Sequence, residues 1–319
     1  MNKRLALLVL SAACLAAFAQ SAPPAAAPLV IVIGSPAGTP GDVVARAISD
    51  PLAAELGQPV VVENRPGAIG TVALAAVARA RPDGQLVGIF GLPAAVAPSL
   101  LDNLPYDSLR DLAPVRQLSA SSNMLVVRAD APYADLPALL AAARKERLTF
   151  ASGGNGTPAH LAGELFAQKL QLQLQHVPYN GAVAGVTGVA GGHVEMMFAT
   201  TPSVVALVKA GRLRAVASTG DRRTAALPDV PTLAEMGHAG LTVRDWHGMV
   251  APAGTPPATL QRLSAALGRV LALDAVQQRM AGAGLEPVAA SGPAEFRALL
   301  ASEMARWNGV VRTPRSKEQ

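Results

Sequence analysis

A glycine-rich segment in the middle of the chain carries the residues best suited to bind a small molecule. Residues 152–157 read Ser-Gly-Gly-Asn-Gly-Thr, and Pro158 follows at the first position of an expected helix. Such small residues let a ligand approach the backbone, and the free amides of a helix N-terminus attract a carboxylate by about 0.3–1 kcal/mol. The segment predicts an anion-binding loop, with a plain tight turn as the alternative. Its candidate contacts are Ser152, Asn155, Gly156, Thr157 and His160.

A second loop of this kind lies near the start of the chain, between residues 34 and 42. Backbone amides at Ala37 and Gly38, together with the Thr39 hydroxyl, can reach a ligand. Asp42 is expected to open the following helix as its N-cap, because a carboxylate there accepts hydrogen bonds from the first-turn amides. Asp42 could also orient the loop or contact an amino group of a ligand directly. Two such loops on facing units would clamp an anion between them.

Motifs that indicate catalysis are missing from the sequence. It contains no G-x-S-x-G, H-E-x-x-H, G-x-x-x-x-G-K-[ST] or G-x-G-x-x-G pattern. A secreted α/β hydrolase is the alternative from another class, and it would require a base hydrogen-bonded to a serine such as Ser152. His160 and Glu164 share a helix face, but two ligands without a third do not predict a metal site. His160 could instead bond to a carboxylate or to the loop backbone. We expect a protein that is not an enzyme and has no cofactor.

The elements that must position both loops form an α/β pattern. Apolar strand-like runs at residues 29–33 and 148–151 lead into the two loops, and ligands in open α/β sheets bind beyond the carboxyl ends of strands. Gly57 predicts the end of the first helix. Further strands are expected at residues 60–62, 176–178, 194–198 and 213–217, and helices at 260–273 and 293–311.

Short proline-punctuated strands near residues 125–127 and 249–250 predict the crossing points between two lobes. Lobe 1 would contain residues 28–124 and 250–319, and lobe 2 would be an insertion of residues 125–249. The composition agrees with this class, since 50% of the residues are hydrophobic but only 3% are aromatic. Cores of Ala, Val and Leu are typical of buried parallel strands.

The first residues predict export. Lys3 and Arg4 precede an apolar run that is shorter than the roughly 20 residues needed to span a bilayer. Ala17-Phe18-Ala19 fits signal-peptidase cleavage, so residues 1–19 are interpreted as a signal peptide. The only cysteine, Cys14, lies inside this segment. The residues before it lack the large aliphatic side chain of a lipidation site, which favours a free periplasmic protein. The net charge of +5 is spread along the chain, without the basic patch of a nucleic-acid-binding protein.

Eight short motifs, in this order, resemble one known family. They are Asn64-Arg-Pro-Gly-Ala68, Pro82-Asp-Gly84, Leu104-Pro-Tyr-Asp107, Asn155-Gly-Thr157, His160-Leu-Ala-Gly-Glu164, Val177-Pro-Tyr179, Leu227-Pro-Asp-Val-Pro-Thr232 and Ala251-Pro-Ala-Gly-Thr-Pro256. The sequence is similar to the substrate-binding proteins of tripartite tricarboxylate transporters, the Bug receptors. The resemblance implies a two-lobed, type II periplasmic-binding-protein (Venus-flytrap) fold whose hinge closes on an organic acid. It also implies delivery to membrane permease subunits. We expect a monomer, and the alternative partner is a membrane sensor.

The resemblance adds pocket residues and also reveals departures. The added candidates are Ala68, Gly70, Tyr179, Phe198 and Ala199. The family usually has an aromatic residue at Ser35, a second glycine at Thr39 and an aspartate at Ala199. It often has a lysine at Asn180 and commonly a glycine at Ile69. Thr39 could replace the hydroxyl that Gly41 lacks. The altered loop and the missing acid lead to the hypothesis of a simple organic acid, rather than citrate or an amino acid, as ligand.

Overall fold

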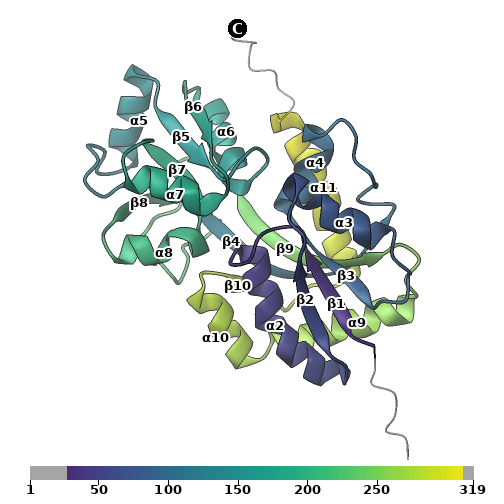
Figure 1. Ribbon diagram of the computed structural model, residues 1–319. Coiled ribbons are helices and arrows are strands. Elements are labelled where there is room, and N and C mark those ends of the chain that lie inside the picture. Colours follow the sequence, from purple (N-terminus) through teal and green to yellow (C-terminus); the bar gives the residue numbers. More distant parts are fainter. Residues whose placement is uncertain (1–26, 312–319) are drawn as a thin grey trace, which may run out of the picture.

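The computed structural model describes residues 27–311. The predicted signal peptide, with Cys14, lies outside these residues. The chain forms a mixed α/β structure in which two sheets share one long strand, as Figure 1 shows. Among the described residues there is no helix with the length and apolar character that a membrane crossing requires.

The first sheet has the strand order β2-β1-β3-β9-β4, with β10 added at β4. Its first three strands are parallel, and β9 and β10 each pair antiparallel to their neighbours. The strands are β1 (Leu29–Ile33), β2 (Val60–Asn64), β3 (Leu86–Gly91), β4 (Leu112–Arg128), β9 (Arg244–Pro252) and β10 (Glu286–Pro287). Its helices are α2 (Pro40–Leu56), η1 (Ala68–Gly70), α3 (Thr71–Ala78), α4 (Leu92–Leu100), α9 (Pro257–Leu271), α10 (Asp274–Gly282) and α11 (Pro293–Val311).

The second sheet continues from the far end of β4. There β4 pairs antiparallel with β7 and β8, and β5 lies parallel to both β6 and β7. The strands are β5 (Thr149–Ser152), β6 (Gln175–Pro178), β7 (Met196–Thr200) and β8 (Leu213–Ser218). The helices are α5 (Leu136–Lys145), α6 (Pro158–Leu170), α7 (Ala182–Ala190) and α8 (Thr201–Lys209). This is the predicted two-lobed α/β class; the exact lobe boundaries remain a prediction.

Apolar faces explain why the helices cover both sides of the first sheet. On one side, Val44 and Ile48 of α2 pack with Leu263 of α9 against the buried strand β1. On the other side, Phe296 of α11 packs against β9 at Gly248, where an added Cβ would lie 2.1 Å from the phenyl ring. Only glycine lets α11 approach so closely. The predicted strand at residues 29–33 is confirmed, and so is the helix end at Gly57, which has a left-handed φ of 67°.

Two expectations differ from the structure. The helix after the first loop begins at Pro40 with Thr39 in the N-cap position, so the prediction that Asp42 caps it is wrong. The Asp42 carboxylate instead reaches back to the amide of Gly38. The crossing strands are also longer than expected, since β4 alone has 17 residues. Its polar stretch around Ser119–Ser122 does not look like a strand in sequence, but β9 supplies the hydrogen-bonding partner for its backbone.

Candidate ligand-binding site

The two predicted loops lie on opposite sides of the boundary between the lobes. The first joins β1 to α2 and the second joins β5 to α6, each after the carboxyl end of a parallel strand. The second loop reaches the first lobe at Gly156, where an added Cβ would lie 2.5 Å from Cδ1 of Leu100 and 3.6 Å from Cδ1 of Ile69. The second loop therefore meets the first lobe at Ile69, next to Gly70, which approaches Gly34 at the start of the first loop. Joint contact of both loops with one ligand remains a prediction.

Asp42 organises the first loop from inside. Its carboxylate is 3% exposed and accepts hydrogen bonds from the Gly38 amide at 2.9 Å, Asn64 Nδ2 at 3.0 Å and Arg46 Nε at 2.9 Å. Asn64 also donates to the carbonyl of Ser35. Burial alone would raise the pKa of Asp42, but the hydrogen bonds from Arg46, Gly38 and Asn64 outweigh it and hold the pKa below its usual value. Contact between Asp42 and a ligand remains a prediction.

The rest of the first loop offers backbone groups. Ala37 and Gly38 are exposed, and Gly38 has a φ of +80°, which favours glycine. The Thr39 hydroxyl donates to the Pro36 carbonyl at 2.8 Å and hydrogen-bonds to the Ser35 hydroxyl at 2.7 Å. Ser35, which departs from the family pattern, is therefore tied to Thr39. The side chains of Ser35 and Thr39 therefore hold each other in place within the loop.

The segment Ala68–Gly70 forms a strained wall beside this loop. Ala68, Ile69 and Gly70 have φ values of 43°, 52° and 94°. Residues other than glycine, such as Ala68 and Ile69, rarely adopt positive φ. An added Cβ at Gly34 would lie 2.3 Å from the Cα of Gly70, so this close approach requires glycine. The predicted contacts Ala68 and Gly70 thus lie next to the first loop. Backbone strain of this kind is often retained at binding sites.

The second loop is held by hydrogen bonds between its own residues. The Thr157 hydroxyl donates to the Gly154 carbonyl at 2.7 Å, and Thr157 occupies the N-cap position of α6, as predicted. The Gly156 amide donates to Nδ1 of His160 at 3.2 Å. Of the two interpretations of His160, the structure shows the contact with the loop backbone. Asn155 is exposed at the tip of the loop.

Ser152 hydrogen-bonds to a histidine, which is the feature that a hydrolase would need. Ser152 Oγ lies 2.7 Å from Nε2 of His176. The serine is fully buried, however, and the same oxygen accepts from the Gly154 amide at 3.0 Å and donates to the Gly154 carbonyl at 3.1 Å. The hydroxyl is thus surrounded by the Gly154 amide, the Gly154 carbonyl and the imidazole, and its burial separates it from solvent. The hydrogen bond supports the loop and does not present a nucleophile to a substrate.

The remaining predicted residues belong to the second lobe. The Tyr179 ring lies over α7, because an added Cβ at Gly188 would be 2.5 Å from its hydroxyl. Phe198 is fully buried and packs on Phe166 with a ring-centroid distance of 5.1 Å. Ala199 is buried on the opposite side of β7. Contact of these three residues with a ligand remains a prediction.

No metal site is evident in the described part of the chain. Nε2 of His160 lies 3.9 Å from Oε1 of Glu164, one helical turn away. Within residues 27–311, no three His, Cys, Asp or Glu side chains gather in a way that could hold a metal ion.

Sequence reasoning missed two polar residues of β9 at the lobe boundary. His247 lies beneath both the first turn of α2 and the end of β3, with its Cδ2 3.1 Å from an added Cβ at Gly41 and 3.2 Å from one at Gly91. Asp245, on the same face, is 2% exposed, and its Oδ1 has no hydrogen-bond partner among the described residues. Burial raises the pKa of Asp245 above its usual value. In the sequence, Asp245 and His247 alternate with the apolar Trp246, and this pattern could have indicated a strand with a polar face.

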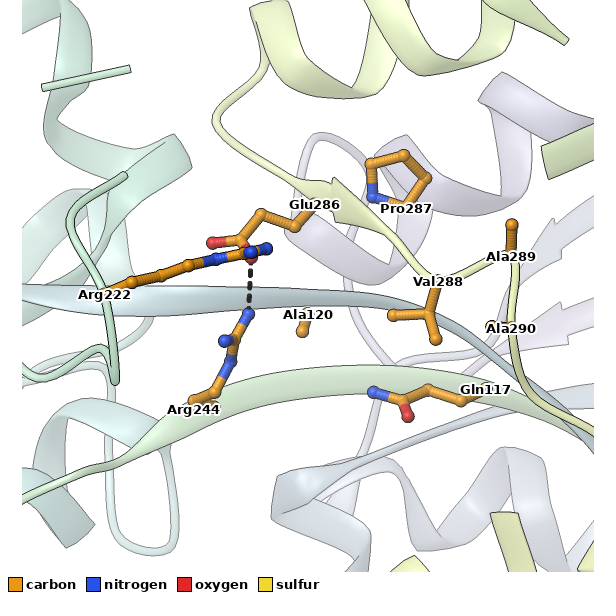
Figure 2. A pocket seen from close by; sticks show the side chains of 9 residues that line it. All are labelled: Gln117, Ala120, Arg222, Arg244, Glu286, Pro287, Val288, Ala289 and Ala290. Atoms are coloured by element: carbon orange, nitrogen blue, oxygen red, sulfur yellow. Dashed lines mark hydrogen bonds and ion pairs between the residues drawn. The ribbon is translucent and has the colours of Figure 1, made fainter. Parts of the chain in front are cut away.

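Ion pairs connect the two lobes on the opposite face of β9. Arg244 bridges Asp221 at 2.6 Å and Glu286 at 2.7 Å, and Arg222 reaches Glu286 at 3.2 Å. Arg222, Arg244 and Glu286 line a pocket of about 370 Å³ beside β10, with Gln117 at its far end, as Figure 2 shows. Because alternate residues of a strand face opposite ways, Arg244 points away from the side where His247 meets α2. The ion pairs of Arg244 therefore lie on the face of β9 opposite His247.

Comparison with known proteins agrees with the fold and the arrangement of the loops. The family model described as "Tripartite tricarboxylate transporter family receptor" matches residues 44–314. The chain belongs to this family. It is also 35% identical over 296 residues to Protein BugT of Bordetella pertussis, and this match covers 92% of this chain and 90% of BugT.

Solved structures of the same kind superpose over almost the whole chain. The periplasmic binding protein BugD matches with a TM-score of 0.79 and 31% identity, over 90% of this chain and 97% of BugD. MatC of Rhodopseudomonas palustris with bound malate has a TM-score of 0.79 and 30% identity, covering 90% and 99% of the two chains. Rpa4515 of R. palustris with adipate has a TM-score of 0.80 and 28% identity, covering 89% and 96%. The predicted family and the two-lobed periplasmic-binding-protein fold are confirmed.

Proposed function

We propose that this protein is a periplasmic receptor that captures a small organic acid between its lobes and delivers it to the membrane subunits of a tripartite tricarboxylate transporter. The observation that carries the proposal is the contact of the second loop, at Gly156, with Ile69 and Leu100 of the other lobe, where Gly70 lies against Gly34 of the first loop. Helix N-termini favour carboxylates through their free amides and their dipole. The structural neighbours with malate and adipate contain ligands of this class.

Binding would be coupled to rotation of the lobes. The main chain crosses between the two sheets through β4, whose register passes from Arg244 of β9 at Ser122 to Thr200 of β7 at Asn123. A ligand that bridges the two loops binds the closed arrangement better than the open one and so shifts the population toward closure. The receptor would release the ligand unchanged, without acting as an enzyme. The full burial of Ser152 supports this part of the proposal.

The loops favour a mono- or dicarboxylate over citrate. Residues 34–42 and 152–160 contain no lysine or arginine, so no cationic side chain within the loops is available for a third carboxylate. The guanidinium of Arg46, one turn into α2, pairs with Asp42. Neutral amides and hydroxyls can hold one carboxylate in each loop.

Calorimetric titration of the mature protein tests this ligand class. We expect malate, adipate or a related dicarboxylate to bind at least tenfold more tightly than citrate. Tighter binding of citrate would contradict the assignment of ligand class. Binding of none of these acids, or chemical conversion of a bound acid detected by mass spectrometry, would contradict the receptor function itself.

A further inference from the structure

We propose that His176, on β6, is a positioning residue that holds the second loop in the conformation that receives the ligand. This inference rests on the proposed carboxylate-binding function. His176 lies outside the loop, 24 residues after Ser152 in the chain. It reaches the loop at two separate points, one through a hydrogen bond and one through a contact between rings.

The first point is the start of the loop. His176 Nε2 lies 2.7 Å from Ser152 Oγ, and Ser152 Oγ accepts from the Gly154 amide at 3.0 Å. Ser152 is fully buried, so water cannot replace the imidazole as its partner without a rearrangement. The position of the Gly154 backbone is thereby linked to the side chain of His176. A change at His176 is expected to loosen this turn.

The second point is the end of the loop. The imidazole of His176 stacks on Phe150 with a centroid distance of 4.9 Å, and it contacts the tilted ring of His160 at a centroid distance of 4.4 Å. His160 in turn accepts the Gly156 amide at Nδ1. The two ring contacts fix the plane of His176, and through His160 they fix the Gly156 amide. Gly156 is the residue that meets the first lobe at Leu100.

The two contacts together give His176 a role that Ser152 or His160 alone does not have. Gly154 and Gly156 both have positive φ values, of 117° and 79°. The Thr157 hydroxyl donates to the Gly154 carbonyl, and the Gly156 amide donates to His160. Side-chain partners therefore hold the unusual backbone of this loop at both ends. Preorganisation of this kind increases affinity because the ligand does not have to order the loop.

Two substitutions separate the contacts. His176→Phe keeps an aromatic ring between Phe150 and His160 but removes the partner of Ser152. His176→Gln keeps a side-chain amide that can reach Ser152 but removes the ring. Gln175→Ala, at the exposed neighbouring position on β6, is the matched control. Ser152→Ala removes the same hydrogen bond from the other side and serves if a His176 variant does not fold.

Affinity for malate and adipate, measured by calorimetry, gives the first readout. His176→Phe and Ser152→Ala should weaken binding about 3- to 10-fold, the loss expected for one hydrogen bond. His176→Gln should recover part of this loss, and Gln175→Ala should bind like the wild type. Wild-type affinity in both His176→Phe and Ser152→Ala would overturn the proposal.

Amide hydrogen exchange of the ligand-free protein gives a readout that does not depend on a known ligand. The amides of Gly154 and Gly156 should exchange faster in His176→Phe, while amides of α9 in the other lobe remain unchanged. Unchanged exchange at both glycines would overturn the positioning role. Faster exchange together with no binding of any carboxylate by the wild type would support the role of His176 and refute the proposed ligand class.

Discussion

Replacement of Asp42 by asparagine should destabilise the first loop, because it removes the charge that three donors share. The carboxylate accepts from the Gly38 amide, from Asn64 Nδ2 and from Arg46 Nε at distances between 2.9 and 3.0 Å. Bonds to a charged group contribute about 1.5–3 kcal/mol each, but Arg46 is half exposed and can be solvated instead. We expect the free energy of unfolding to fall by about 2–3 kcal/mol at neutral pH.

The pH dependence of this loss follows from the lowered pKa of Asp42. A carboxyl whose folded-state pKa lies below its unfolded value contributes stability above the unfolded pKa and loses it as pH falls through the folded pKa. The difference between wild type and Asp42→Asn should therefore be full at pH 7 and should decrease as the pH falls below the unfolded-state pKa of 3.8. Urea denaturation at several pH values measures it. Asp50→Asn, an exposed change on the same helix, is the control. Equal stability of Asp42→Asn and wild type at pH 7 would refute the reasoning.

Three further changes test the crossing strands. Asp245→Asn should raise the free energy of unfolding by about 1–3 kcal/mol at pH 7, because the raised pKa of Asp245 means that its ionised form opposes folding; the gain should vanish near pH 4, as melting curves across pH would show. Gly248→Ala should lower the free energy of unfolding by about 1–3 kcal/mol in urea denaturation, because the new methyl group would clash with the ring of Phe296. An unchanged free energy of unfolding would contradict this packing. Glu286→Gln should weaken the ion pair with Arg222 and change ligand affinity less than threefold, with a smaller effect at 0.5 M salt. A larger change in affinity that does not depend on salt would contradict an electrostatic contribution.

The first loop shows what the sequence could predict. The apolar run of β1 and the left-handed stop at Gly57 are local signals, and both were found where local rules place them. The role of Asp42 was not local, because Asn64 of β2 is one of its partners. An aspartate near a helix start looks like a cap in sequence. Orientation of the preceding loop was the alternative, and the structure shows it through the hydrogen bond from the Gly38 amide.

The second loop and the hinge show the same limit. Thr157 at the start of α6 followed from the threonine–proline signal. The link between Ser152 and His176 requires β5 and β6 to pair in register, and no spacing in the sequence encodes that pairing. The long β4 was missed because its polar middle has no apolar alternation. Its strand conformation is stabilised by partners on other parts of the chain.

A thermal-shift panel on the mature, ligand-stripped protein tests the central claim most directly. The panel contains mono-, di- and tricarboxylates, acidic amino acids and aromatic acids. A ligand present at 100 times its Kd should add about 2.7 kcal/mol to the stability, which raises Tm by several degrees. We predict such a shift with small mono- or dicarboxylates and a smaller one, or none, with citrate and amino acids. The absence of a shift with every acid would contradict the account of this protein as a carboxylate receptor.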